Sequence, residues 1–133
     1  MSREDEAALL ALTLGRLALG RKAEKMVLLD LRSLATFADF MIILSGRSTR
    51  QVQSLAENIL REAKNIKVKA LGKEGLNEGR WALLDFGPVV VHVFLEEVRG
   101  YYDLEGLWSD ALQYDWSDQT GEPPILDSDP DAG

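Results

Sequence analysis

Two apolar segments separated by Gly87-Pro88 constrain the fold of this chain more than any other feature. They cover Trp81–Phe86 and Val89–Leu95 and are rich in the β-branched and aromatic residues that are typical of strands. A glycine accepts the positive φ at the first central position of a type II′ turn, and proline fits the second position. The segment Gly79–Leu95 is therefore predicted to form a buried β-hairpin.

A two-residue turn also sets which side chains of the hairpin share a face, because directly opposed residues point to the same side of a sheet. One face is entirely apolar and is predicted to lie in the core: Ala82, Leu84, Phe86, Val89, Val91 and Val93. The other face adds a carboxylate and an imidazole to apolar side chains: Trp81, Leu83, Asp85, Val90, His92 and Phe94. This second face is either a surface on which a partner docks or a face covered by a helix. Periodicity does not separate the two interpretations, and a register slip of one residue would exchange the faces.

The segments before the hairpin predict two helices and three strands. The first helix runs from Ser2, whose side chain pairs with Asp5 as an N-cap, to Leu19, and its buried stripe is Leu10, Leu14 and Leu17. The second begins at the Ser48–Gln51 capping box, and its apolar residues follow helical spacing: Val52, Leu55, Ala56, Ile59, Leu60 and Ala63. Strands are predicted at Met26–Leu31, Asp39–Leu44 and, with a lysine-bearing wet face, Ile66–Leu71.

A length of 133 residues allows one domain with a real core. A mobile connection is predicted over Gly72–Arg80, and a short last helix carries Tyr101, Leu104 and Trp108 on one side. The expected fold class is α/β, a single domain with a mixed sheet of about five strands flanked by helices. Residues 1–114 form this domain, and residues 115–133 are expected to be a disordered acidic tail.

The net charge of -7 is concentrated in that tail, which holds six acidic residues and no Lys or Arg. The rest of the chain is nearly neutral, so it offers no broad field for tracking phosphates. A protein is the expected main partner, with RNA contacted at most at the periphery of a complex. The absence of Cys and the single His exclude a disulfide framework, a thiol nucleophile and a Cys/His zinc site. No apolar run has the roughly 20 residues of a membrane span, and the chain is expected to be cytoplasmic.

An enzymatic interpretation starts from the polar residues in or beside strands: Asp30, Asp39, Asp85 and His92. The strand followed by the Ser45–Ser48 turn and a helix resembles the opening of a nucleotidyltransferase, which needs two further acids spaced Asp-x-Asp to hold magnesium. Asp85 stands alone in Leu-Leu-Asp-Phe-Gly. A nucleotide-handling enzyme of nucleotidyltransferase type therefore stays only as the alternative, and no metal or cofactor is predicted.

Five separated blocks of sequence resemble the Iojap-type ribosomal silencing factors over about residues 5–112. The blocks are Asp39-Phe-Met-Ile-Ile-Leu-Ser-Gly-Arg-Ser-Thr-Arg-Gln-Val52, Glu74-Gly75, Trp81-Ala-Leu-Leu-Asp-Phe-Gly87, Val89-Val-Val-His-Val-Phe94 and Arg99-Gly-Tyr-Tyr-Asp-Leu-Glu-Gly-Leu-Trp108. Their order along the chain makes the resemblance specific. It implies a nucleotidyltransferase-like fold without an active site, which agrees with the missing Asp-x-Asp.

The resemblance also implies a function and a partner. It implies a non-catalytic translational repressor that binds ribosomal protein fourteen of the large ribosomal subunit and obstructs joining of the small subunit when nutrients are scarce. Such a protein is ribosome-associated and is able to form a homodimer. The residues expected to bind the partner are Glu74, Gly75, Trp81, Leu83, Asp85, His92, Phe94 and Tyr102. Pro88 departs from the family, which commonly has Asp there, so one acidic contact is expected to be absent.

Overall fold

A six-stranded mixed sheet with helices on both faces forms the protein in a computed structural model, which describes residues 2–21, 23–116 and 126. The strands are β1 (Glu24–Asp30), β2 (Phe40–Gly46), β3 (Gly72–Glu74), β4 (Trp81–Asp85), β5 (Val89–Leu95) and β6 (Leu112–Asp115). The helices are α1 (Arg3–Leu19), α2 (Thr49–Asn65), α3 (Glu96–Tyr102) and α4 (Leu104–Leu107). The predicted α/β class is confirmed, with one strand more than expected.

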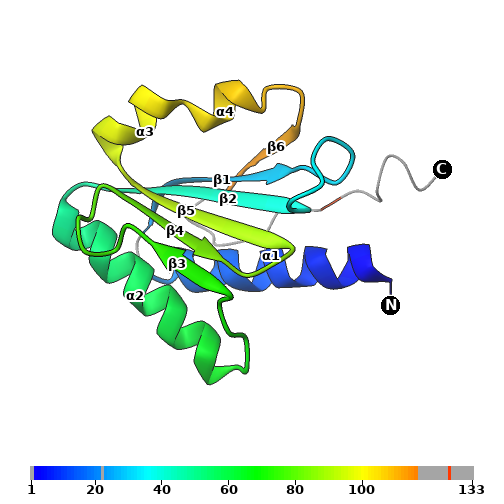
Figure 1. Cartoon of the computed structure of the whole chain (residues 1–133), viewed down its shortest axis with the longest axis horizontal. Coiled ribbons are helices and arrows are strands. Elements are labelled where there is room, and N and C mark those ends of the chain that lie inside the picture. Colours follow the sequence, from blue (N-terminus) through cyan, green and yellow to red (C-terminus); the bar gives the residue numbers. More distant parts are fainter. Residues whose placement is uncertain (1, 22, 117–125, 127–133) are drawn as a thin grey trace.

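The strand order is β3-β4-β5-β2-β1-β6, and only the central pair of β2 and β5 is parallel. Helices α1 and α2 pack on one face of the sheet, while α3 and α4 lie over the other (Figure 1). Strands β2 and β5 are buried along their whole length because helices cover them on both sides. Helices therefore cover the centre of the sheet on both faces and leave its edges less covered.

The hairpin of β4 and β5 has the predicted register. Trp81 is opposite Phe94, and Asp85 is opposite Val90. Gly87 has a φ of 88°, and the N–H of Phe86 donates to the carbonyl of Val89 at 2.9 Å. Every residue of the predicted core face is buried: Ala82, Leu84, Phe86, Val89, Val91 and Val93. The alternation of side chains therefore assigned both faces correctly.

Pro88 fits its turn because nothing there requires a backbone N–H from it. Its carbonyl oxygen instead accepts hydrogen bonds from the backbone N–H groups of Asp39 at 2.8 Å and Phe40 at 3.1 Å. The hairpin turn is thereby fastened to the start of β2.

Helix α1 begins at the predicted cap, where the Ser2 side chain accepts from the backbone N–H of Asp5 and the Asp5 side chain accepts from that of Ser2. Its buried stripe differs from the prediction, because Leu10 and Leu17 are only half-buried. The stripe consists of small residues around one leucine: Ala7, Ala11, Leu14 and Ala18. The indole of Trp116 packs where a Cβ on residue 15 would stand, so Gly15 and its alanine neighbours allow a close approach that leucines would prevent.

The strand predicted at Ile66–Leu71 is wrong. This segment ends α2: Lys67 takes a φ of 68°, and the N–H of Val68 donates back to the carbonyl of Ala63 at 2.8 Å. The last carbonyls of a helix need hydrogen-bond donors. In this segment, the bonds that end the helix decide the backbone conformation, although lysine and apolar residues alternate as in a strand. The strand forms later, as β3, within the stretch that was expected to be only a mobile connection.

The C-terminal part of the fold holds more structure than the sequence indicates. The predicted single helix is divided into α3 and α4 at Asp103, whose φ is 47° and whose side chain accepts from the N–H of Gly106 at 3.1 Å. Strand β6 was not predicted and pairs with β1. The fold thus extends to Asp115 and to the buried Trp116, two residues past the expected boundary. The predicted acidic tail otherwise lies outside the described residues, apart from Leu126.

Candidate functional site

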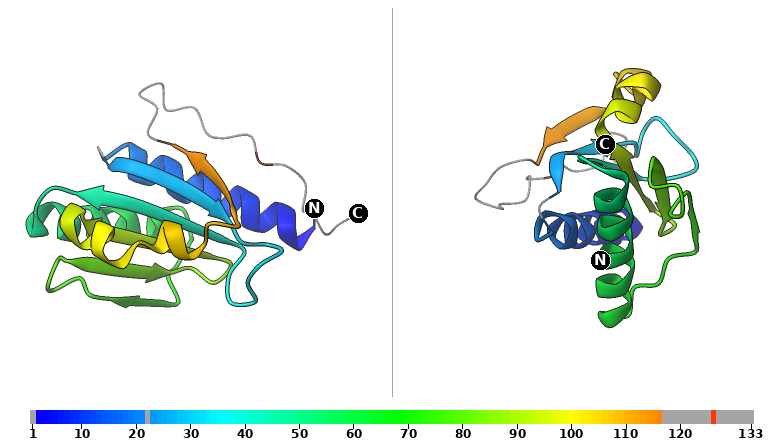
Figure 2. Two further views of the ribbon diagram at one scale, coloured as in Figure 1. Left: turned by 90° about the horizontal axis from the view of Figure 1, so that it is seen from above. Right: turned by 90° about the vertical axis from the view of Figure 1, so that its left-hand side faces the viewer.

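The second face of the hairpin is covered by a helix at one end and open at the other. Phe94 is 0% exposed and His92 is 5% exposed, whereas Trp81, Leu83 and Asp85 are half-buried. Figure 2 shows why: α3 and α4 run over the central strands, and β3 and β4 emerge beside them. The helix-covered interpretation therefore holds for His92 and Phe94, and docking of a partner stays a prediction for the open end.

We define the β4 face as the open part of this surface. It consists of Glu74, Trp81, Leu83, Asp85 and Tyr102. Glu74 is opposite Leu83 in the sheet and points to the same side. Glu74 and Tyr102 are exposed, and the other three are half-buried.

An aromatic cluster organises the β4 face around Trp81. The Trp81 ring stacks on Phe94 with centroids 4.8 Å apart and contacts Tyr102 with centroids 4.6 Å apart. Its indole Nε1 donates a hydrogen bond to Nδ1 of His92 at 2.9 Å. The buried members therefore hold the orientation of the two rings that reach the surface. Phe94 and His92, both predicted to bind the partner, lie below these rings and support them.

The two carboxylates of the β4 face differ in their bonding. An Asp85 side-chain oxygen accepts from the N–H of Gly87 at 2.8 Å, which ties it to the hairpin turn. Glu74 forms no hydrogen bond or ion pair within the described residues. Leu71 was not predicted here, yet it is 77% exposed, and its N–H donates to the carbonyl of Asp85 at 2.7 Å. The side chain of this exposed leucine lies against Gly87 at the hairpin turn.

Gly75 has a conformational role at the end of β3. It takes a φ of 79°, and a Cβ at this position would overlap the carbonyl oxygen of Trp81. Glycine alone avoids both the left-handed strain and this overlap. Gly75 therefore lets the connection cross directly beside Trp81.

Burial lowers the pKa of His92 from 6.5 to about 4. The imidazolium would lose its hydration among Trp81, Phe94 and the sheet, and desolvation disfavours the charged form. The hydrogen bond from the indole also needs an unprotonated Nδ1, so the neutral ring carries its proton on Nε2. His92 is thus a neutral hydrogen-bond acceptor at physiological pH.

We expect acid to destabilise the fold through His92. Between pH 6.5 and 4 the unfolded chain binds a proton that the native His92 does not, so stability falls as the pH falls through this window. The free energy of unfolding should drop by about 2 kcal/mol more between pH 7 and pH 5 in the wild type than in His92→Gln. Urea titrations at both pH values measure this difference. Equal drops in the two proteins would contradict the assignment.

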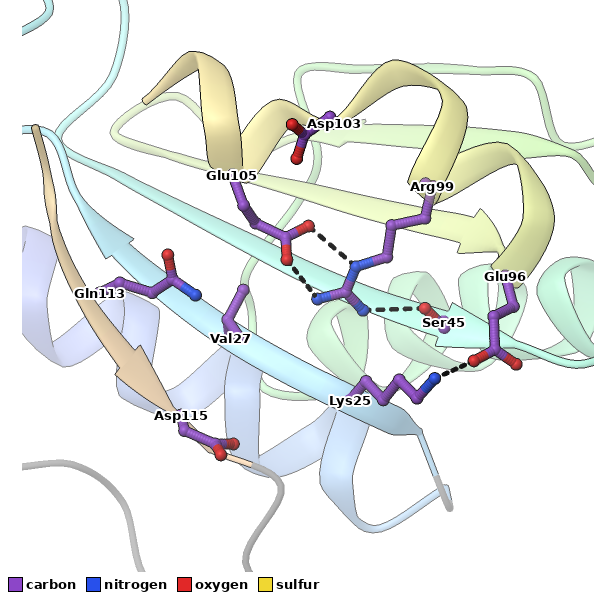
Figure 3. Close-up of a pocket in the computed structure, with 10 residues that line it drawn as sticks. Lys25, Val27, Ser45, Glu96, Arg99, Asp103, Glu105, Gln113 and Asp115 are labelled. Carbon is purple, nitrogen blue, oxygen red and sulfur yellow. Dashed lines mark hydrogen bonds and ion pairs between the residues drawn. The ribbon is translucent and has the colours of Figure 1, made fainter. Parts of the chain in front are cut away.

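Arg99 holds α3 in place over the sheet. It is 8% exposed, and its guanidinium forms two hydrogen bonds to Glu105, at 2.9 and 3.2 Å, and one to Oγ of Ser45 at 2.8 Å (Figure 3). Lys25 and Glu96 form a second ion pair on the same side of the sheet. Because Tyr102 lies on α3, this network also positions the exposed tyrosine against Trp81.

The residues of the enzymatic alternative do not meet. Asp85 is opposite Val90 at the start of β5, whereas Ser45 is opposite Phe94 near its end. Four strand residues separate the two sites by about 13 Å. Asp30 pairs with Arg32, and Asp39 pairs with Arg3.

Neither a metal site nor a membrane span stands out in the part of the chain that the structure describes. It contains no group of three or more His, Cys, Asp or Glu side chains placed to hold a metal ion. None of its helices combines the length and the hydropathy needed to cross a bilayer.

Comparison with known proteins identifies relatives of the whole domain. Residues 4–131 match the family model described as ribosomal silencing factor during starvation. The ribosomal silencing factor RsfS of Halalkalibacterium halodurans is 42% identical over 91 residues, which cover 68% of this chain and 78% of that protein. A crystal structure of a Chromobacterium violaceum protein superposes with a TM-score of 0.71 and 33% identity, covering 96% of this chain and 95% of the other. A mouse protein named mitochondrial assembly of ribosomal large subunit protein 1 is 33% identical over 76 residues, 55% of this chain and 33% of its own length. The chain belongs to the family of ribosomal silencing factors.

Proposed function

We propose that the protein is a translational repressor that docks its β4 face on ribosomal protein fourteen of the large ribosomal subunit. Bound there under nutrient limitation, the domain obstructs joining of the small subunit by its bulk. It acts in the cytoplasm, in association with ribosomes, and without catalysis. The observation that carries the proposal is the half-buried Trp81, which stacks on the buried Phe94 and donates to the buried His92 at the more open end of the hairpin face.

The composition of the β4 face supports a protein partner. Interface centres favour aromatic anchors such as Trp and Tyr, surrounded by polar groups. Trp81 and Tyr102 fit the anchor positions, and Leu83 extends the apolar area between them and Asp85. The carboxylates of Glu74 and Asp85 would complement a basic ribosomal surface. The name of the mouse relative also refers to the large subunit.

Sedimentation with isolated subunits tests the proposal directly. We expect the purified protein to migrate with large subunits and not with small subunits in a sucrose gradient. Preincubated large subunits should then form fewer complete ribosomes when small subunits are added, because the bound domain occupies the joining surface. Migration at the top of the gradient with both subunits would refute the proposal. Binding without any effect on subunit joining would refute its steric mechanism.

A homodimer stays a prediction, and the structure changes how it is tested. Phe94 is fully buried, so a substitution such as Phe94→Asp would disturb the core and not only a surface. Leu83→Asp changes a half-buried residue of the β4 face instead. A wild-type dimer that this variant converts to a monomer in light scattering would place self-association on the β4 face.

A further inference from the structure

Four lysines gather where α2 ends and β3 begins. Lys64, Lys67, Lys69 and Lys73 lie within ten residues that contain no Asp or Glu, in a chain with 15 Lys and Arg residues in total. All four are exposed, and their side chains form no hydrogen bond or ion pair within the described residues. The domain as a whole is nearly neutral, so this is a local excess of positive charge.

Three of these lysines line a cavity of about 330 Å³. Lys64, Lys69 and Lys73 surround it, and its apolar wall is formed by Leu60, Ala70 and Leu71. We call this feature the lysine pocket. Its lysines come from three different segments: the last turn of α2, the connection after it, and β3. The fold therefore brings together charges that the sequence alone would distribute along a helix and a strand.

A helix dipole does not account for the lysine pocket. A cation in the last turn of a helix interacts favourably with the free carbonyls, and this explains Lys64. Lys69 and Lys73 lie outside α2, so its last turn does not by itself account for them. Their unpaired charges leave them available for an external anion.

The lysine pocket borders the β4 face across a single strand. Lys73 is opposite Leu84 and so points to the side of the sheet covered by α2, whereas its neighbour Glu74 points to the β4 face. Leu71 lies against the hairpin turn at Gly87. A partner that covers the β4 face would therefore bring its own periphery next to the lysine pocket.

We propose that the lysine pocket binds the phosphate backbone of RNA at the rim of the docked complex. This inference rests on the proposed function, because the large subunit supplies the RNA. Lysine binds phosphate as a mobile point charge, and residues 64–73 supply four lysines. This segment contains no aromatic residue that would stack on a base. The contact is therefore to phosphates and carries no sequence specificity.

The salt dependence of binding tests the lysine pocket. Lys69→Gln combined with Lys73→Gln removes two charges without touching the dipole of α2. We expect several-fold weaker binding to large subunits at low salt. The slope of the logarithm of the binding constant against the logarithm of salt concentration should become shallower by roughly 1.5 to 2. The matched control is Arg16→Gln with Arg50→Gln, which removes the same charge from exposed positions elsewhere.

Three results of this comparison have distinct meanings. If the wild type binds large subunits and the lysine variant shows the same salt dependence, the proposed RNA contact of the lysine pocket is refuted. The proposed function is then unaffected. Equal weakening toward isolated ribosomal protein fourteen would refute the RNA contact as well, because the lysines would then face an acidic protein surface. If the wild-type protein does not bind large subunits, the proposed function itself is refuted.

Directed cleavage of RNA gives an independent readout. The chain contains no cysteine, so Lys69→Cys provides a single attachment point for an iron–EDTA probe. We expect hydroxyl radicals from this probe to cut ribosomal RNA in the complex. The same probe on Leu9→Cys, an exposed position of α1, should give no cuts or cuts elsewhere. A sedimenting complex in which position 69 yields no RNA cleavage would overturn the proposal.

Discussion

Trp81→Ala is expected to reduce docking on the large ribosomal subunit severely at concentrations that just saturate the wild type. Central aromatic anchors typically contribute at least 2 kcal/mol to an interface, so the dissociation constant should rise at least about 30-fold. The truncation also removes the stack on Phe94, the contact with Tyr102 and the donor to His92. Fluorescence titration and sedimentation with large subunits measure the loss.

The effect of Trp81→Ala on stability must be measured separately from its effect on affinity. We expect Trp81→Ala to lower the free energy of unfolding by about 2–3 kcal/mol, less than a fully buried Trp would cost. Trp108→Ala is the matched control: it removes a half-buried Trp from the C-cap of α4, where the ring contacts Phe37 at a centroid distance of 5.7 Å. It should lose stability and keep its affinity. Equal losses of affinity in the two variants would show that docking depends on general integrity and not on Trp81.

Gly75→Ala is expected to damage the fold and the docking face together. An alanine there must adopt a φ of 79° and place its Cβ on the carbonyl oxygen of Trp81. Because that oxygen belongs to the backbone of β4, relief requires the strand itself to move. We expect a loss of about 2–4 kcal/mol in the free energy of unfolding and at least tenfold weaker docking. Denaturant titration and sedimentation measure the two effects.

Gly72→Ala, three residues earlier in β3, provides the control for this substitution. A Cβ on Gly72 meets no atom within 4 Å, and its φ is not in the left-handed region. Its stability and affinity should stay close to those of the wild type. A stable Gly75→Ala protein with normal affinity would contradict the close approach of this connection to Trp81.

Local sequence patterns predicted the helices and strands that are fixed by residues within the element itself. The hairpin follows from alternation around Gly87-Pro88, and α2 follows from its cap at Ser48 and its apolar spacing. The strand expected at Ile66–Leu71 was wrong because Lys67 adopts a left-handed φ for which the sequence offers no glycine. Strand β6 was missed because Leu-Gln-Tyr-Asp has little apolar character and forms by pairing with β1. Long-range contacts decide such segments.

The candidate site was predicted as a set of residues but not as a surface. The sequence placed Trp81, Leu83 and Asp85 on one face, and the structure agrees. It could not show that α3 would bury Phe94 and His92, because this depends on Arg99 reaching Ser45 from a distant segment. The only sign of the lysine pocket in the sequence is its composition: residues 64–73 contain four lysines and no Asp or Glu. That composition was attributed to the wet face of a strand.

The parallel pairing of β2 with β5 has a consequence for synthesis of the chain. Phe40 pairs with Val89, so about fifty residues must be made after β2 begins before its partner exists. A nascent chain emerges with its N-terminus first and therefore exposes a largely apolar strand with one unpaired edge during that interval. Helix α2 and strand β4 are made within this interval, β4 joins the central strands only when β5 arrives, and Tyr102 of the β4 face follows after β5. The surface proposed to silence ribosomes is thus completed late in its own translation.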